Sequence, residues 1–244
     1  MKRKFILFDL DGTLLPLEQS NFTKKCFSLL AQKLIPYGFT IEHLKIATYA
    51  MMKNDGTKTN EEAFWDKLSE VYGSDARKYS SVFDEFYAHD FDEVKTLCGF
   101  NSQIPQLIKT LKEKGFKLAV ATSPLFPKVA IEKRIAWAGL NIDDFELITS
   151  YETSHFSKPN TSYYAEVLKN LKTKPSNSLM IGNDAIEDLA AESLGIKTFL
   201  LTDCLINSQN DNLELIPHGN VSNLANFIEK ECQISLTQIS NNKS

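Results

Sequence analysis

Five short stretches of the chain are continuously apolar, a pattern typical of strands that are buried on both faces of a parallel sheet. The first of them includes Phe5, Ile6, Leu7 and Phe8. The strands that we expect cover residues 4–10, 117–122, 145–149, 178–182 and a shorter run from 198. Helical patterns separate them, and this alternation predicts an α/β fold with a parallel sheet and right-handed crossovers.

The second half of the chain carries apolar residues at helical spacing between these strands. Ile104, Leu107, Ile108 and Leu111 form one such stripe, and Gly115 follows as a stop signal. The helices that we expect here cover residues 101–114, 127–138, 162–171 and 185–194.

Residues 17 to about 95 break the alternation, because they contain helical patterns and no strong strand. The helices that we expect there cover residues 21–34, 41–52, 60–72 and 75–91, with a loop at 54–60. Phe64 and Trp65 could line a substrate pocket, but an amphipathic helix needs such residues for its own core, and we favour the core.

These patterns divide the chain into three parts. We expect a core made of residues 1–16 and 96–232, a helical insert at 17–95, and a flexible polar tail at 233–244.

Composition narrows the classes of function. The 244 residues are 43% hydrophobic and carry a net charge of -4, which fits a folded globular protein without the basic field that binds nucleic acid. The four cysteines show no zinc spacing and no disulfide framework. The apolar run near the N-terminus is too short for a signal peptide, and no stretch is long enough to span a membrane. We therefore expect a cytoplasmic protein.

Polar side chains follow the ends of several expected strands, where ligands bind in open parallel sheets. They are Asp9, Asp11, Thr122, Ser123, Lys158, Asn183, Asp184, Glu187 and Asp188. Carboxylates that converge on one pocket repel each other unless a cation is present, and oxygen ligands favour Mg²⁺ over zinc. The sequence therefore predicts a magnesium site beside a phosphate.

Asp9 and Asp11 are separated by one residue, and this spacing suggests that they have different chemical roles. Asp9 can attack phosphorus, while Asp11 can face the leaving oxygen and handle protons. Gly12 permits a tight turn and close approach of the phosphate. The hydroxyl of Thr122 or Ser123 and the ammonium of Lys158 can bind the equatorial phosphoryl oxygens, and Thr13 completes the candidate substrate-binding set.

The segments DLDGT, VATS, SKP and GNDAIED occur in this order and resemble the four motifs of the haloacid dehalogenase superfamily of phosphatases. The resemblance implies a Rossmann-like core, a magnesium-dependent aspartyl-phosphate mechanism, and an insert that acts as a cap over the site. It implies Asp9 as nucleophile and metal ligand, and Asp11 as acid/base and, through its carbonyl, second ligand. It also implies that Thr122 donates a hydrogen bond to the phosphate and that Lys158 stabilises its negative charge.

The acidic loop departs from the family pattern, because Gly182-Asn183-Asp184 stands where a Gly-Asp pair is usual. The spacing of Asp184 and Asp188 matches the family's two acidic positions. We therefore assign Asp184 to the metal and Asp188 to its water shell, while Asn183 is the alternative ligand if the loop is aligned on Gly182.

Each motif alone has an ordinary structural explanation. Thr122 and Ser123 could cap a helix, Lys158 could be surface charge, and acidic residues are favoured in a helix's first turn. Their joint occurrence at successive strand ends favours an active site.

Within this family, an aspartate at the position of Asp11 favours a phosphatase over a dehalogenase. A phosphomutase and a catalytically silent binding module are the alternatives, and the expected substrate is a small phosphorylated metabolite such as a sugar phosphate or nucleotide.

Overall fold

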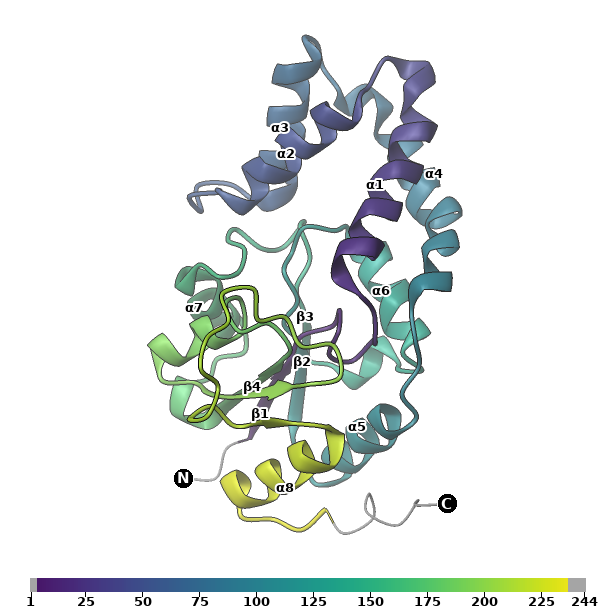
Figure 1. Ribbon diagram of the computed structural model, residues 1–244. Coiled ribbons are helices and arrows are strands. Elements are labelled where there is room, and N and C mark those ends of the chain that lie inside the picture. The colour runs from purple at the N-terminus through teal and green to yellow at the C-terminus, as the bar shows by residue number, and fades with distance from the viewer. Residues whose placement is uncertain (1–3, 237–244) are drawn as a thin grey trace.

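The computed structural model describes residues 4–236, which form an α/β fold around one six-stranded sheet (Figure 1). All strand pairs are parallel, and the order across the sheet is β3-β2-β1-β4-β5-β6. From β1, the chain adds β2 and β3 on one side of the sheet. It then returns to place β4 beside β1 on the other side and continues outward to β5 and β6. This is the doubly wound Rossmann-like arrangement, so the expected fold class is confirmed.

The strands lie where the apolar runs predict them, but most are shorter. Their bounds are β1 (Phe5–Phe8), β2 (Lys117–Val120), β3 (Leu147–Ile148), β4 (Ser178–Gly182), β5 (Lys197–Leu201) and β6 (His218–Gly219). Phe8 at the end of β1 pairs with Val120 on one side and Ile181 on the other. The two-residue β6 was not expected, because no apolar run precedes it.

The two faces of the sheet are covered by different helices. Because successive side chains of a strand point to opposite faces, Ile6 and Phe8 join one buried cluster and Leu7 joins the other. The first cluster includes residues of α5 (Gln103–Glu113), α6 (Lys128–Trp137) and α8 (Val221–Cys232). The second includes residues of α7 (Thr161–Asn170) and the 3₁₀-helix η6 (Leu189–Leu194). Both faces are therefore buried, as the unbroken apolar runs indicate.

A block of helices lies between β1 and β2 in the sequence, above the strands' carboxyl ends in Figure 1. The α-helices are α1 (Gln19–Leu34), α2 (Ile41–Met52), α3 (Asn60–Tyr72) and α4 (Ser80–Ala88), and the 3₁₀-helices are η1 (Ile35–Tyr37), η2 (Arg77–Tyr79) and η3 (Asp90–Leu97). The single helix expected at 75–91 is divided into three segments, because the backbone leaves the α-helical conformation at Tyr79 and again at His89.

Asn60, at the start of α3, ties this helical block to the core. Its side chain is fully buried and donates to the carbonyls of Pro124 and Phe156 and to Ser157 Oγ. The side-chain oxygen of Asn60, Oδ1, accepts a hydrogen bond from Asn54 Nδ2. The backbone amide of Asn60 also donates to the carbonyl of Ser154. One residue of the block thus joins two loops of the core.

The helix expected at 185–194 is confirmed only in its second part, as a 3₁₀-helix that Gly195 caps. Turns replace its first part, and only η6 follows. Asp184 Oδ1 accepts hydrogen bonds from the amides of Ile186 and Glu187, and Asp188 Oδ2 accepts from the amide of Asp184. Side chains that bind nearby amides compete with the helical hydrogen bonds, and here they fold the segment into a loop.

The C-terminal end of the described chain closes the core. The helix α8 was not among the helices that we expected, and Leu236, within the tail expected at 233–244, is buried. Residues 237–244 lie outside the described residues.

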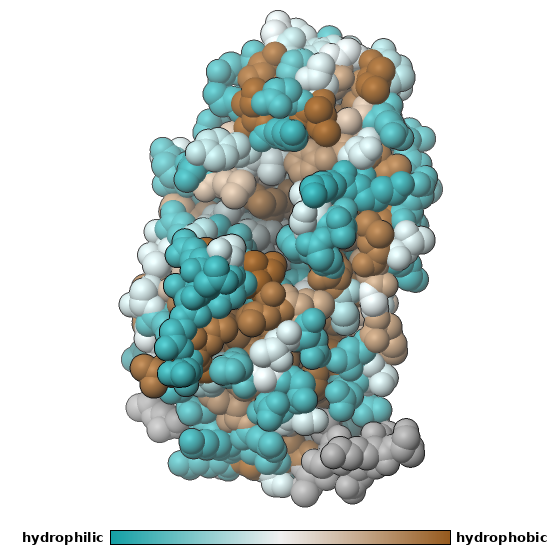
Figure 2. Space-filling view, viewed as in Figure 1, coloured by the Kyte–Doolittle hydropathy of each residue, from teal (hydrophilic) through white to brown (hydrophobic). Residues whose placement is uncertain are grey.

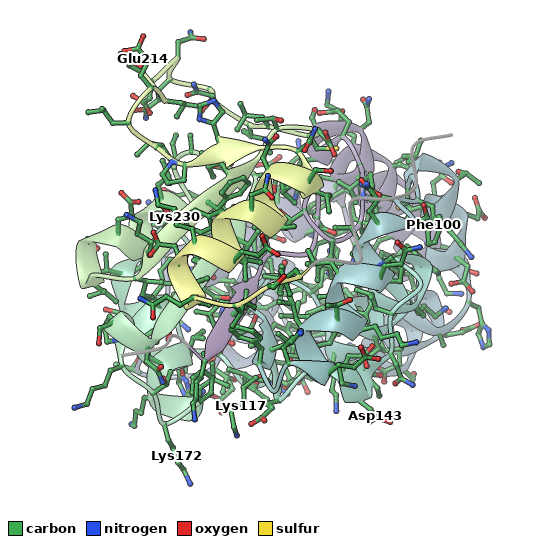
Figure 3. All side chains as sticks on the ribbon, turned by 90° about the horizontal axis from the view of Figure 1, so that it is seen from below. Phe100, Lys117, Asp143, Lys172, Glu214 and Lys230 are labelled. Carbon is green, nitrogen blue, oxygen red and sulfur yellow. The ribbon has the colours of Figure 1, made fainter. Side chains whose placement is uncertain are left out.

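The end of the molecule opposite the helical block carries charged side chains that point outward, among them Lys117, Lys172 and Asp143 (Figure 3). Within residues 4–236, no helix combines the length and the apolar character needed to span a membrane.

Candidate active site

The loops that follow β1, β2 and β4 meet at the point where the strand order reverses, and they enclose a cavity of about 90 Å³. Figure 2 shows the surface hollowed between the helical block and the core. The cavity is lined by Asp9, Asp11, Gln19, Thr122, Ser123, Leu125, Phe126, Asn183, Asp184, Glu187, Asp188 and Ile206. Most of the polar residues that the sequence placed at strand ends therefore come together.

The turn after β1 depends on Gly12. Its φ is +82°, a left-handed conformation that favours glycine, and an added Cβ would lie 2.2 Å from Asn183 Nδ2. Thr13 Oγ1 donates to Asn183 Oδ1 over 3.0 Å. Neither Gly12 nor Thr13 lines the cavity. The structure thus places these two expected substrate-binding residues behind the site, where they hold the β1 loop against the β4 loop.

Lys158 lies between two carboxylates. Its buried Nζ donates to Asp9 Oδ1 over 2.8 Å and to Asp188 Oδ1 over 2.6 Å. Burial alone would lower the pKa of Lys158, but Asp188 and Asp9 outweigh it and raise that pKa well above its usual value. Lys158 therefore stays charged and fixes the orientation of Asp9.

The pKa of the Asp9 carboxyl group is shifted by its surroundings. The pKa of Asp9 is raised to about 7, mainly by burial; Asp188 adds to this rise, and the opposing effect of Lys158 does not cancel it. A further positive charge in the cavity would favour the ionised form of Asp9.

Asp188 organises the loop after β4. Its Oδ2 accepts hydrogen bonds from the backbone amides of Asn183 and Asp184, over 2.9 and 3.0 Å. An added Cβ at Gly182 would lie 2.0 Å from the same oxygen. Glycine at this position therefore makes room for the carboxylate that holds both the loop and Lys158.

Asp11 forms a buried ion pair with Arg134 of α6, which is hydrogen-bonded through Nη1 to Asp11 Oδ2. Burial raises the pKa of Asp11, and Arg134 opposes that shift. Asp11 Oδ1 and Arg134 Nη2 are buried without a hydrogen-bond partner among residues 4–236. The guanidinium also lies 4.4 Å from the ring centroid of Phe126, at cation–π distance.

Arg134 was missed in the sequence, although one signal could have found it. Ala130, Ile131 and Ile135 form the buried stripe of α6, and Arg134 occupies the same face. A charged residue within an apolar stripe needs a buried partner of opposite charge. That requirement would have pointed to one of the acidic residues at the strand ends.

Thr122 and Ser123 bring hydroxyl groups to the cavity. The carbonyl of Thr122 accepts hydrogen bonds from Thr149 Oγ1 and from the Tyr163 hydroxyl, over 2.7 and 2.9 Å, which fixes the loop after β2. Ser123 Oγ is buried and has no hydrogen-bond partner within the described part of the chain. An oxygen-rich ligand in the cavity could satisfy it.

The oxygen groups of the cavity fit a magnesium ion. Asp9 and Asp184 each supply a carboxylate, and Mg²⁺ typically takes one or two carboxylates together with waters and substrate phosphate. Asn183 is less available, since its amide donates to the Cys204 carbonyl and accepts from Thr13. Across residues 4–236, no three His, Cys, Asp or Glu side chains gather closely enough to form a metal site by themselves.

The fold places the protein among the doubly wound α/β proteins, which bind ligands at the switch point of the sheet. Residues 6–201 match the sequence profile described as haloacid dehalogenase-like hydrolase, and the chain belongs to this family. The resemblance of the four motifs is thus confirmed.

Two curated relatives and one solved structure illustrate the similarity. The glyceraldehyde 3-phosphate phosphatase of Methanothermobacter thermautotrophicus is 28% identical over 86% of this chain and 91% of its own. The phosphoglycolate phosphatase of Aquifex aeolicus is also 28% identical, over 81% of this chain and 84% of its own. The crystal structure of a HAD phosphatase from Thermococcus onnurineus has a similar fold, with a TM-score of 0.56, 17% identity and coverage of 94% and 99%.

Proposed function

We propose that this protein is a magnesium-dependent hydrolase of small phosphomonoesters that works through an aspartyl-phosphate on Asp9. The chain is a phosphatase of the haloacid dehalogenase-like family, and the two curated relatives described above are named as phosphatases. The metal, the intermediate and the roles of individual residues are the content of the proposal.

The observation that carries it is the placement of Asp9. Asp9 directly follows β1 at the switch point of the sheet. Its carboxylate lines the cavity and is oriented by Lys158. In the first step, an oxygen of Asp9 attacks phosphorus, the ester P–O bond breaks, and the leaving oxygen takes a proton from Asp11. Burial raises the pKa of Asp11, so the carboxyl group that pairs with Arg134 is protonated for this step more readily than an exposed aspartate would be.

In the second step, Asp11 removes a proton from a water molecule that attacks the phosphorus of the aspartyl-phosphate. The bond between phosphorus and Asp9 breaks, and inorganic phosphate leaves. The hydroxyls of Thr122 and Ser123 and the ammonium of Lys158 would bind the phosphoryl oxygens, where charge is spread during transfer.

Asp9, Asp184 and the backbone carbonyl of Asp11 would hold the Mg²⁺ ion. When bound, the ion offsets the repulsion between the phosphate dianion and the attacking carboxylate. We assign the third position to Asp184, because both ends of the Asn183 amide are already hydrogen-bonded. Asp188 acts on Lys158 and on the loop amides rather than on the ion.

We assign the helical block, residues 17–95, to a cap that limits the access of water to the site. Its position above the strand ends supports this role (Figure 1). A cytoplasmic location, and a chain without nucleic-acid or membrane partners, stay predictions from the sequence.

Phosphate release from a panel of phosphomonoesters, with and without Mg²⁺, tests the proposal. Asp9→Asn is expected to lower kcat at least about 10³-fold, because the nucleophile is lost. Asp143→Asn is the matched control, since Asp143 is exposed at the opposite end of the molecule (Figure 3). A variant Asp9→Asn that keeps magnesium-dependent release would overturn the mechanism.

A further inference from the structure

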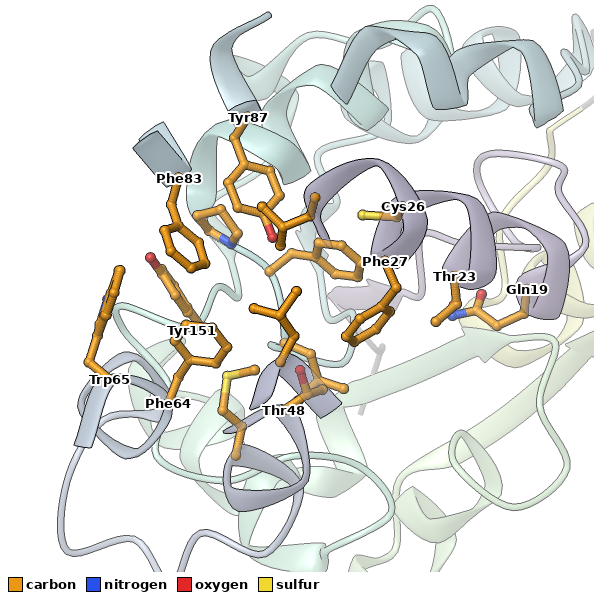
Figure 4. A pocket seen from close by; sticks show the side chains of 16 residues that line it. Gln19, Thr23, Cys26, Phe27, Thr48, Phe64, Trp65, Phe83, Tyr87 and Tyr151 are labelled. Carbon is orange, nitrogen blue, oxygen red and sulfur yellow. The ribbon is translucent and has the colours of Figure 1, made fainter. Parts of the chain in front are cut away.

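A second cavity, of about 100 Å³, lies within the helical block and against the core. It is lined by Gln19, Thr23, Cys26, Phe27, Leu30, Leu44, Thr48, Met51, Phe64, Trp65, Phe83, Tyr87, Leu125, Phe126, Pro127 and Tyr151. In Figure 4, Gln19 and Thr23 lie toward one end, and Trp65 and Phe83 lie toward the other. Helices α1 to α4 and the loops after β2 and β3 all contribute to its wall.

The two cavities adjoin. Gln19, Leu125 and Phe126 line both the cavity at Asp9 and the cavity within the helices. A phosphoryl group held beside Asp9 would therefore have its ester oxygen and leaving group close to these three shared side chains.

The chemistry of the second cavity differs from that of the first. None of its lining residues is charged, and most of its wall consists of aliphatic and aromatic side chains. Phe64 and Trp65 are buried, and their rings pack on each other and on Phe83. Phe64 and Trp65 therefore belong to the core of the helical block, as we expected, but they also line the cavity, which is the alternative that the sequence left open.

We propose that this cavity binds the leaving group of the substrate, and that this group is an uncharged, mainly apolar alcohol with one ring or a short alkyl chain. The inference rests on the proposed phosphatase function and narrows its substrate class. An apolar cavity of about 150 Å³ in another protein holds benzene, so the present volume sets a comparable limit on size. A larger sugar or nucleoside is not accommodated in this conformation.

The uncharged lining of the cavity also disfavours the binding of charged leaving groups. A carboxylate such as that of phosphoglycolate, or a second phosphate, would lose its hydration without gaining a cationic partner. This lack of a second anion site also disfavours a phosphomutase that holds a bisphosphate.

The test compares four primary alkyl esters with native protein and Mg²⁺: benzyl phosphate, n-butyl phosphate, sn-glycerol 3-phosphate and phosphoglycolate. Methyl phosphate serves as the reference, because it reports phosphoryl transfer without filling the cavity. We expect kcat/KM for the benzyl and butyl esters to exceed that for the glycerol and glycolate esters at least about tenfold, from apolar burial alone. An equal or reversed preference would overturn the proposal.

Thr48→Phe provides a second readout, since Thr48 of α2 lines the cavity and does not line the cavity at Asp9. The larger ring is expected to lower the ratio of kcat/KM for benzyl phosphate to that for methyl phosphate at least about tenfold, because only the benzyl group needs the cavity. Ser28→Phe is the matched control, because Ser28 is exposed on α1. If Thr48→Phe also loses methyl phosphate turnover, the substitution has disturbed the site at Asp9 as well, and the ester series with native protein decides.

Failure of the two proposals can be told apart. If even methyl phosphate releases no phosphate, the phosphatase proposal fails, and binding of benzyl alcohol then tests the cavity directly. Fluorescence of Trp65 in a Trp137→Phe background should change saturably with benzyl alcohol, and Thr48→Phe should abolish the change. Absence of any saturable change in the parent protein would overturn the assignment of the cavity.

Discussion

The ion pair between Asp11 and Arg134 allows a quantitative prediction about stability. Both side chains are buried, and Arg134 is fully inaccessible to solvent. Replacing Arg134 with Met keeps much of the apolar volume but leaves the carboxylate of Asp11 without its cation. Breaking a buried pair in this way costs about 3–5 kcal/mol, because an uncompensated charge stays behind.

Such a loss is large enough for routine measurement. For a protein of this size, about 1 kcal/mol shifts Tm by about 2–4 °C, so Arg134→Met should lower Tm by about 6–20 °C. Lys133→Met is the matched control on the same helix. Its partner Asp92 lies at the surface, where an ion pair contributes about 0–1 kcal/mol. The free energy of unfolding, measured in urea, is expected to fall much less for the control.

A double-mutant cycle isolates the pair. In an Asp11→Asn background there is no buried negative charge to leave behind, so Arg134→Met should cost at least about 2 kcal/mol less than in the native background. If the costs of the two single substitutions instead add to within about 0.5 kcal/mol, the ion pair does not control the environment of Asp11, and the reasoning is refuted.

Two further predictions concern residues that position the site. Gly182→Ala should lower kcat about as much as Asp188→Asn, because the new Cβ displaces the Asp188 carboxylate that holds Lys158. The kcat of the double variant should be no lower than that of either single variant. Steady-state kinetics in which the two effects multiplied would contradict this reasoning. Asn60→Ala should speed hydrogen exchange at the start of α3 and leave α5 unchanged, since it removes the side-chain amide that donates to both core loops. Unchanged exchange at α3 would count against Asn60 as the residue that joins the helical block to the core.

The strands were predictable because their burial on two faces leaves a plain mark in the sequence. The run from Ser178 to Gly182 is a strand over those same residues. By contrast, β6 contains only two residues, His218 and Gly219, and its pairing with β5 depends on how the rest of the chain brings it there. No local pattern specifies such a strand.

The site divides along the same line. Asp9, Asp11, Thr122 and Asp184 were identified from strand ends, and all four line one cavity. Arg134 was missed, because its partner lies 123 residues away and the contact exists only after folding. The first part of the helix expected at 185–194 failed for a local reason instead, since hydrogen bonds from the Asp184 side chain to nearby amides outweighed helical periodicity.

The hydrogen bonds of Asn60 imply a limit on the speed of turnover. They join α3 to two carbonyls and one hydroxyl of the core whichever ester is bound, because none of these acceptors belongs to a substrate. If the helical block must detach for inorganic phosphate to escape after the alcohol has left, the rate of that detachment is the same whichever ester was cleaved. Good substrates would then share one maximal kcat, and they would differ only in the concentration at which they reach it.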